Sequence, residues 1–345
     1  MCCVAQEAAD WSRESRFSAF RMRHPDGNAQ LLAMIGRHFR VPPANCTPSA
    51  AVPSAVAPCE QRHLFESYLY LTQLQQARCY ETAFSHWRRG RSSAAHTMGI
   101  LYWQLNAIWQ GPDWSTIEYD GRLRLAHHAS RRAFAPLLLS GVRDAVARDD
   151  ESHVLDIHLS NDLPRRVEGT LRVRLYRWRD APAYPLAELE TRAAIPPASS
   201  HMVWRVDLMQ MMLLQTPQRV ALPPSAVFAR LTFVPAEPEA EAVEAFHWLA
   251  PFKEVELPAA QPRILHVAQV SPTAAAISLA SNATAAFVTV ECATVIGAFS
   301  DAAFLLLAGD APTTVTFEAQ APFALDAFAA ALRVRSLSDT VVPVA

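Results

Sequence analysis

Hydrophobic residues recur with two different periods along this chain, and the change between them falls near residue 142. Before that point, Leu64, Tyr68, Leu71 and Leu74 follow one another at intervals of four and three residues. This spacing places the four side chains on one face of an α-helix, which we expect to end near Trp87. The N-terminal part of the chain is therefore predicted to be mainly helical.

After this helix, the pattern predicts a strand followed by a second helix. Residues 97–103 form a short apolar run that ends in aromatic residues, as expected of a strand buried on both faces. A polar loop follows, and a helix is expected from about Arg122 to Ala135, where Pro136 stops it. Strand, long loop and helix in this order are typical of one unit of a parallel sheet or barrel.

From residue 152 onward, the hydrophobic period changes to two. Leu155, Ile157 and Leu159 alternate with polar residues, and so do the hydrophobic residues of 171–175. Such strands have one face in water and one face in a core. Further strands are expected at residues 203–208, 227–234, 264–270, 285–292, 314–317 and 332–335. Short strands separated by proline-rich turns predict two β-sandwiches, with a boundary near residues 251–262.

Composition and motifs narrow the classes of function. The formal charge of −2 lacks the basic excess that nucleic acid requires, so no nucleic-acid partner is expected. No apolar run approaches the roughly 20 residues that cross a bilayer, and we expect no membrane insertion. Neither a metal-ligand spacing nor a glycine-rich phosphate loop occurs, so no metal and no cofactor are expected. Two glycosylation sequons begin at Asn45 and Asn282.

One segment carries a specific resemblance to a known family. Residues 96–106 read HTMGILYWQLN and are followed by Ile108-Trp109-Gln110. This segment resembles the last barrel strand of family 2 glycoside hydrolases of the lysosomal β-mannosidase type. Similar motifs occur at residues 10–12, 24–28, 71–73, 114–119, 127–137, 246–249 and 297–301. The resemblance runs from about residue 9 to the C-terminus.

The resemblance implies a fold that combines an α/β segment with all-β domains. Residues 9–142 would be the C-terminal part of a TIM (β/α)8 barrel catalytic domain, after an unplaced segment at 1–8. Residues 143–255 and 256–345 would be two immunoglobulin-like β-sandwiches. Members of this family carry further β-domains and most of the barrel before this point, so we expect a missing N-terminal portion as a partner. The family resemblance also implies a lysosomal location, and we expect no signal peptide in the chain as written.

The implied activity is retaining hydrolysis of terminal β-D-mannose from oligosaccharides and glycoproteins. This chemistry needs two carboxyl groups about 5–5.5 Å apart. In the family both catalytic glutamates precede the matched region, so we expect no catalytic residue here and an inactive isolated chain. Glu118 imitates the nucleophile motif, but it follows the last strand; Asp113 is expected to be a solvated surface charge. The alternative is a non-catalytic fragment or pseudoenzyme that binds sugar or associates with another subunit.

Trp103 is the expected contact with a mannose-terminated oligosaccharide. It ends the predicted strand at the barrel mouth, where an indole can pack against the apolar face of a pyranose. The resemblance implies the same role, in the subsite for the terminal mannose. The alternative for Trp103 is a core aromatic that closes the barrel. Gln104 and Asn106 are candidates for amide hydrogen bonds to sugar hydroxyls.

The loop after Asn106 differs from the family at one position. Relatives usually have aspartate where this sequence has Ala107, so the geometry of the loop is an open question. We expect Trp109 and Trp114 to anchor the loop rather than to bind a ligand.

Overall fold

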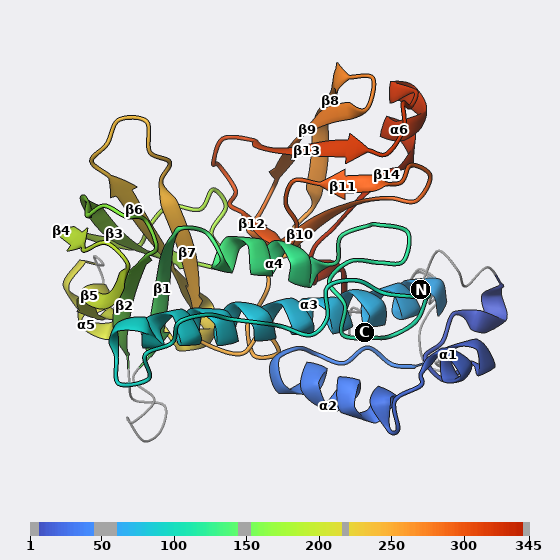
Figure 1. The fold of residues 1–345 in the computed structure, drawn as a ribbon, viewed down its shortest axis with the longest axis horizontal. Coiled ribbons are helices and arrows are strands. Elements are labelled where there is room, and N and C mark those ends of the chain that lie inside the picture. Colours follow the sequence, from blue (N-terminus) through green and yellow to red (C-terminus); the bar gives the residue numbers. More distant parts are fainter. Residues whose placement is uncertain (1–6, 45–60, 144–152, 216–220, 341–345) are drawn as a thin grey trace. The chain divides into compact units, whose positions relative to one another are not determined.

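The computed structural model describes residues 7–44, 61–143, 153–215 and 221–340, which form two compact units. The first unit combines Met1–Arg78, Tyr102–His128 and Pro258–Ala345, and the second combines Cys79–Leu101 and Ala129–Leu257. The long helix α3 (Gln61–Arg89) contributes residues to both units (Figure 1).

Helices dominate the N-terminal part of the first unit, as the sequence predicts. A short 3₁₀ turn (Ala8–Asp10) precedes α1 (Arg16–Arg21) and α2 (Gly27–His38). Ser15 caps α1, because its hydroxyl oxygen accepts a hydrogen bond from the Ser18 backbone N–H at 3.1 Å. In α3, Leu64, Leu71 and Leu74 are at most 2% exposed, which confirms the helix that their spacing predicted.

The C-terminal part of the first unit is a β-sandwich. One sheet has the strand order β12-β10-β14 and the other β11-β13-β9-β8. Their bounds are β8 (Pro262–Ser271), β9 (Ala274–Ser281), β10 (Ala285–Cys292), β11 (Gly297–Phe299), β12 (Phe304–Leu306), β13 (Thr313–Ala319) and β14 (Leu332–Arg335). Helix α6 (Leu325–Ala331) inserts Phe328 into the core, where its ring stacks on Phe317 at 4.7 Å.

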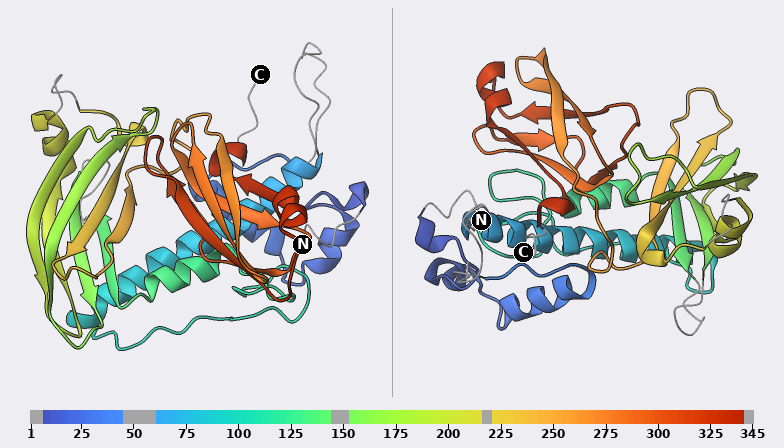
Figure 2. Two further views of the ribbon diagram at one scale, coloured as in Figure 1. Left: turned by 90° about the horizontal axis from the view of Figure 1, so that it is seen from above. Right: turned by 180° about the vertical axis from the view of Figure 1, so that it is seen from behind.

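A second β-sandwich forms most of the second unit, with sheets β1-β2-β5 and β4-β3-β6-β7 (Figure 2). The strands are β1 (Leu137–Arg143), β2 (Val154–Asn161), β3 (Val167–Arg177), β4 (Ala187–Ile195), β5 (Ser199–Asp207), β6 (Val227–Pro235) and β7 (Val243–Trp248). Leu155, Ile157 and Leu159 are fully buried in its core, so the predicted alternation is confirmed. Two further helices are α4 (Leu125–Ala133), which contributes residues to both units, and α5 (Leu208–Gln215) of the second unit.

Two observations depart from the sequence prediction. The apolar run at residues 97–103 belongs to no sheet, and Met98 and Leu101 are 77% and 97% exposed. The predicted strand is therefore wrong here, because a strand needs neighbours for its backbone groups and every described sheet is built from other segments. Secondly, β1 starts at Leu137, before the change of period near residue 142.

Candidate functional site

Backbone hydrogen bonds hold the segment after Tyr102 against the loop that follows it. The Leu105 carbonyl accepts from the N–H groups of Thr116 and Ile117 at 3.0 and 2.9 Å, and Ala107 N–H donates to the Ile117 carbonyl at 2.8 Å. The Thr116 hydroxyl also donates to the Leu105 carbonyl at 3.0 Å. The two segments therefore form one ordered double-stranded turn, which carries the candidate residues.

Trp103 lies at the beginning of this turn and is 74% exposed. Its peptide bond to Gln104 is cis. The alternative of a buried core aromatic is therefore wrong for the described structure. The indole presents a large surface to solvent, as a platform for a sugar ring would.

The two amide candidates lie next to Trp103 on the same turn. Gln104 Nε2 donates to the Asn106 carbonyl at 3.2 Å, and Asn106 Nδ2 donates to the Ala107 carbonyl at 3.3 Å. Each amide nitrogen thus contacts the local backbone, and each amide oxygen is a further hydrogen-bond acceptor. The structure therefore brings Trp103, Gln104 and Asn106 together on one short segment.

Arg124 pairs with two carboxylates of the loop, Asp113 and Glu118. Its guanidinium contacts Asp113 Oδ1 at 2.6 Å and Glu118 Oε1 at 2.7 Å, and its side chain is only 7% exposed. Burial lowers the pKa of Arg124, but the hydrogen bonds and charges of Glu118 and Asp113 outweigh it and raise the pKa above its usual value. The expectation that Asp113 is a solvated surface charge is wrong, because its side chain is 13% exposed and paired.

Sequence reasoning missed Arg124 because its partners lie at separations that match neither a helix nor a strand. Both carboxylates act as structural partners of this arginine, so neither is suited to act as a nucleophile or a proton donor. The third carboxylate of the loop, Asp120, pairs with Arg122.

Aromatic and cationic contacts anchor the far side of the loop. The guanidinium groups of Arg21 and Arg23 lie 5.0 and 5.8 Å from the Trp109 ring centroid, and Arg21 Nη1 donates to the Gln110 carbonyl at 2.7 Å. Trp109 is therefore a loop anchor, as predicted. Trp114 is 56% exposed, but its ring contacts His24 edge-to-face at 5.8 Å, and its backbone carbonyl accepts from Gln76 Nε2 at 2.9 Å.

Ala107 is 4% exposed and donates from its backbone to Ile117. A small apolar side chain fits this closed position. An aspartate carboxylate in the same place would need a partner to offset its desolvation. The loop is thus ordered with alanine at position 107.

Of the two glycosylation sequons, the structure describes the asparagine of one, Asn282. Asn282 is exposed at the turn between β9 and β10, and its Oδ1 accepts from the Gln261 backbone N–H at 2.7 Å. This contact leaves the amide nitrogen, which a glycan would modify, on the outer side of the turn. Asn45 lies outside the described residues.

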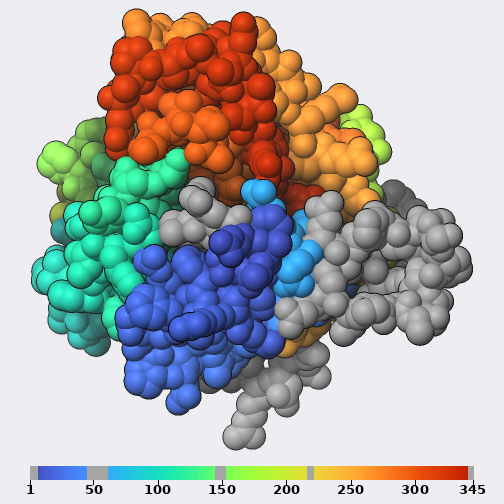
Figure 3. Space-filling model, turned by 90° about the vertical axis from the view of Figure 1, so that its right-hand side faces the viewer, coloured from blue at the N-terminus to red at the C-terminus, as the bar shows by residue number. Residues whose placement is uncertain are grey.

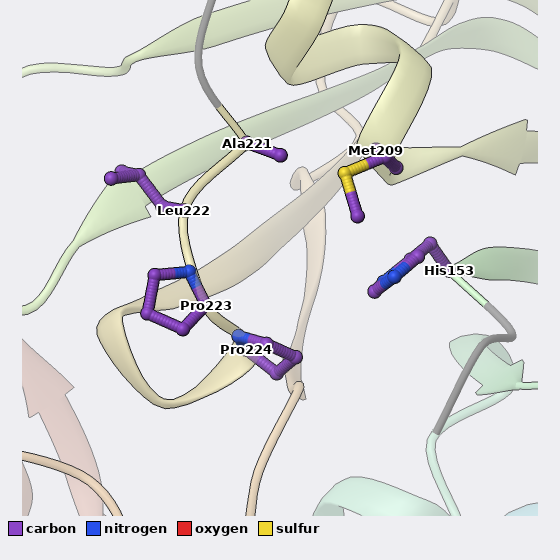
Figure 4. Close-up of a pocket in the computed structure, with 6 residues that line it drawn as sticks. All are labelled: His153, Met209, Ala221, Leu222, Pro223 and Pro224. Carbon is purple, nitrogen blue, oxygen red and sulfur yellow. The ribbon is translucent and has the colours of Figure 1, made fainter. Parts of the chain in front are cut away.

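A separate hollow of about 400 Å³ lies on the second unit (Figure 4). His153 and Met209 line one side, and Pro223 and Pro224 line the other. It offers one imidazole and no carboxylate, which is too little for acid–base chemistry. Among the described residues, no His, Cys, Asp or Glu cluster could hold a metal ion, and no described helix is long and apolar enough to span a membrane.

Comparison with known proteins shows what this chain is similar to. Residues 259–340 match the Ig_mannosidase family, an Ig-fold domain. The chain is 29% identical over 335 residues to a β-mannosidase of Mus musculus, in an alignment that covers 96% of this chain and 35% of that protein. It is 39% identical over 173 residues to the β-mannosidase of Capra hircus, covering 49% and 17% respectively.

The solved structure of the β-D-mannosidase from Dictyoglomus thermophilum shares the fold, with a TM-score of 0.70 and 19% sequence identity. That match covers 96% of this chain and 34% of the solved one. The shared fold and the matched Ig-fold domain make the chain similar to β-mannosidases. More narrowly, the similarity is to a C-terminal part of those proteins. It spans about a third or less of the length of the relatives that it matches.

Proposed function

We propose that this chain supplies part of the substrate-binding wall of a β-mannosidase that removes terminal β-linked mannose from oligosaccharides. The exposed indole of Trp103, with the Gln104 and Asn106 amides fixed beside it, carries the proposal. An aromatic face stacks on the C–H groups of a pyranose, and adjacent amide oxygens accept hydrogen bonds from its hydroxyls. Residues 9–142 would then be the last part of a TIM-barrel wall, and the lysosome would be the site of action.

In this assignment, the chain binds and orients mannose, and both catalytic carboxylates come from a preceding portion of the protein. Pairing with Arg124 keeps Asp113 and Glu118 out of the reaction. In retaining hydrolysis, one external carboxylate attacks the anomeric carbon while the other, as an acid, protonates the departing glycosidic oxygen. Water, deprotonated by that second group, then releases mannose from the glycosyl-enzyme. Trp103 contributes by holding the terminal sugar in place for that attack.

Ligand-observed NMR with methyl β-D-mannoside tests the binding role. We expect millimolar binding by the 345-residue chain and its loss in Trp103→Ala, with no turnover of an aryl β-mannoside by either protein. Trp87→Ala is the matched control, because Trp87 is also exposed, at 43%, but lies on α3 away from the candidate segment in sequence. Binding that survives in Trp103→Ala, or turnover by a preparation free of other glycosidases, would contradict the proposal.

A second candidate function is subunit association without catalysis. Its support is the apolar surface of residues 98–101, where Met98 and Leu101 are 77% and 97% exposed. Exposed apolar side chains on an unpaired extended segment favour docking of another chain. Sedimentation velocity tests this function: association that Leu101→Ser abolishes supports it, and a monomer at all concentrations argues against it.

A further inference from the structure

Three arginines close to the end of α3 differ in their partners. Arg88 Nη2 contacts Asp162 Oδ2 at 3.0 Å, and Arg91 pairs with the other oxygen of the same carboxylate. Arg89 lies between them in the sequence, and no carboxylate of the described residues lies within ion-pair distance of it. Its guanidinium donates instead from Nη1 to the Ser140 hydroxyl oxygen at 3.2 Å. Arg89 therefore carries a charge that no described side chain balances directly.

The Ser140 hydroxyl lies beside His158 on the outer face of the β1-β2-β5 sheet. The two residues are direct partners in the antiparallel register of β1 and β2, so their side chains project from the same face. Their neighbours Leu139 and Ile157 point the other way, into the sandwich core. The Nδ1 atom of His158 is buried and has no hydrogen-bond partner among the described residues. A guanidinium, a hydroxyl and an imidazole thus meet at one place in the second unit.

The charges around this cluster leave it positive. Desolvation lowers the pKa of the Arg89 guanidinium. The pKa of His158 is lowered to about 4, mainly by desolvation and next by the charge of Arg89, and His201 of β5 acts in the same direction. Asp156 opposes these effects, but its carboxylate is held by Arg205 of β5 through two hydrogen bonds, at 2.5 and 2.7 Å. The cluster is therefore complementary to a negative charge.

Two enclosed arginines of the first unit show the usual alternative. Arg124 pairs with two carboxylates of its loop, and Arg335 contacts Glu66 of α3 at 2.8 Å. In Figure 3, the N-terminal segment of this unit in blue, its loop in blue-green and its C-terminal strands in orange and red border one another. Taking a guanidinium out of water without a counter-charge costs free energy. An anion from solution is the complement that Arg89 lacks.

We propose that Arg89, Ser140 and His158 form a binding site for a small inorganic anion of the size of chloride. Arg89 donates from its guanidinium, Ser140 from its hydroxyl and protonated His158 from Nδ1. The Ser140 hydroxyl hydrogen is available, because Arg89 uses only the oxygen. A small ion contacts both donors at once, since Arg89 Nη1 and Ser140 Oγ are 3.2 Å apart. Protonation of His158 adds a donor and a charge, so the anion binds more tightly at acid pH. This site does not depend on the proposed function.

Urea denaturation of the 345-residue chain in sodium chloride and in sodium gluconate, at equal ionic strength, tests the site. Gluconate has the charge of chloride but is too bulky for contact with all three donors. Chloride at about ten times its dissociation constant should lower the unfolding equilibrium constant about tenfold relative to gluconate. This chloride effect should be larger at about pH 4.5 than at about pH 7.5, and His158→Gln should remove the difference.

Variants at the other two donors identify the site. Arg89→Gln should abolish the chloride effect, and Ser140→Ala, which keeps both basic groups, should weaken chloride binding about tenfold. Arg91→Gln is the matched control, because Asp162 pairs with the charge that it removes, and its chloride effect should equal that of wild type. Chloride NMR line broadening measures binding to the folded chain directly, and Ser140→Ala decides the matter if Arg89→Gln does not fold.

Three outcomes overturn the anion site. The first is an equal response of the wild type to the two salts. The second is a chloride effect that persists unchanged in both Arg89→Gln and Ser140→Ala. The third is loss of the chloride effect in Arg91→Gln, which would show a general response to the charge of the α3 end.

Discussion

Arg124 donates from Nε and Nη2 to the two carboxylate oxygens of Glu118, at 2.7 and 3.1 Å. The same guanidinium reaches Asp113 through Nη1 at 2.6 Å and donates to the Ser115 carbonyl at 3.0 Å. One arginine thereby fixes both ends of the 113–118 loop, which pairs with residues 105–107. Because the guanidinium is buried, the arginine and the two carboxylates need each other's opposite charge to offset the free-energy cost of leaving water.

Arg124→Gln should therefore destabilise the protein strongly. The substitution leaves two largely buried carboxylates without a counter-charge, which typically costs about 3–5 kcal/mol of unfolding free energy. Urea denaturation followed by tryptophan fluorescence measures the loss. Arg122→Gln is the matched control: its pair with Asp120 has side chains 24% and 33% exposed, so a loss below about 1 kcal/mol is expected. Equal losses in the two variants would show that Arg124 has no special structural role.

Tyr70→Phe should loosen the contact between α3 and the C-terminal sandwich. The Tyr70 hydroxyl donates to the Phe287 carbonyl at 2.6 Å and is fully enclosed, which raises its pKa well above the usual value. Removing the hydroxyl leaves a buried carbonyl without this donor and should cost about 1–3 kcal/mol. Thermal unfolding measures the change. Tyr184→Phe, at a residue 71% exposed, should leave the melting temperature unchanged, and a Tyr70 variant that melts like wild type would refute the expectation.

Regular hydrophobic periods along the sequence made part of this fold predictable. The buried leucines on one face of α3 and the alternation in β2 both result from side-chain burial, and a hydrophobic pattern reports burial. Strand β9 has the sequence AAAISLAS, in which alanine and serine give too little contrast for a period to appear. The run at 97–103 has the composition of a buried strand, but pairing depends on neighbours that no local pattern reports.

The candidate site was predictable only in part. A family-like motif pointed to Trp103, and its exposure agrees with an outward position. Arg124 could not be found in this way. Its partners Asp113 and Glu118 are brought to it by loop closure, and a single sequence does not encode such a pairing in any fixed spacing.

Gly169→Ala should destabilise the second-unit sandwich through a steric clash. A Cβ at this position of β3 would lie 2.8 Å from Phe233 Cζ and 2.9 Å from Pro235 Cα, with the Val234 carbonyl closer still. Overpacking of this kind costs about 1–3 kcal/mol, because the neighbouring strand β6 must shift. Gly99→Ala serves as the control, since a Cβ there meets nothing within 4 Å. Chemical denaturation measures the unfolding free energy of both variants. A Gly169→Ala variant as stable as wild type would mean that β6 shifts without loss of stability.

His158 should make the protein less stable as the pH falls. The pKa of His158 is lowered from 6.5 to about 4, mainly by desolvation and next by the charge of Arg89. The charge of Asp156 opposes these effects, and His201 adds a smaller lowering effect. The unfolded chain therefore binds a proton between about pH 6.5 and 4 that the folded chain does not, so unfolding becomes easier over this window and is unaffected above it. His158→Gln removes this titrating group. The slope of the unfolding free energy against pH should then decrease, by up to the amount that the binding of one proton contributes. Urea denaturation at intervals from pH 4.5 to pH 7.5 measures both slopes, with His201→Gln on the exposed neighbouring position of β5 as the control. A wild-type slope that His158→Gln leaves intact would assign the acid sensitivity to other groups.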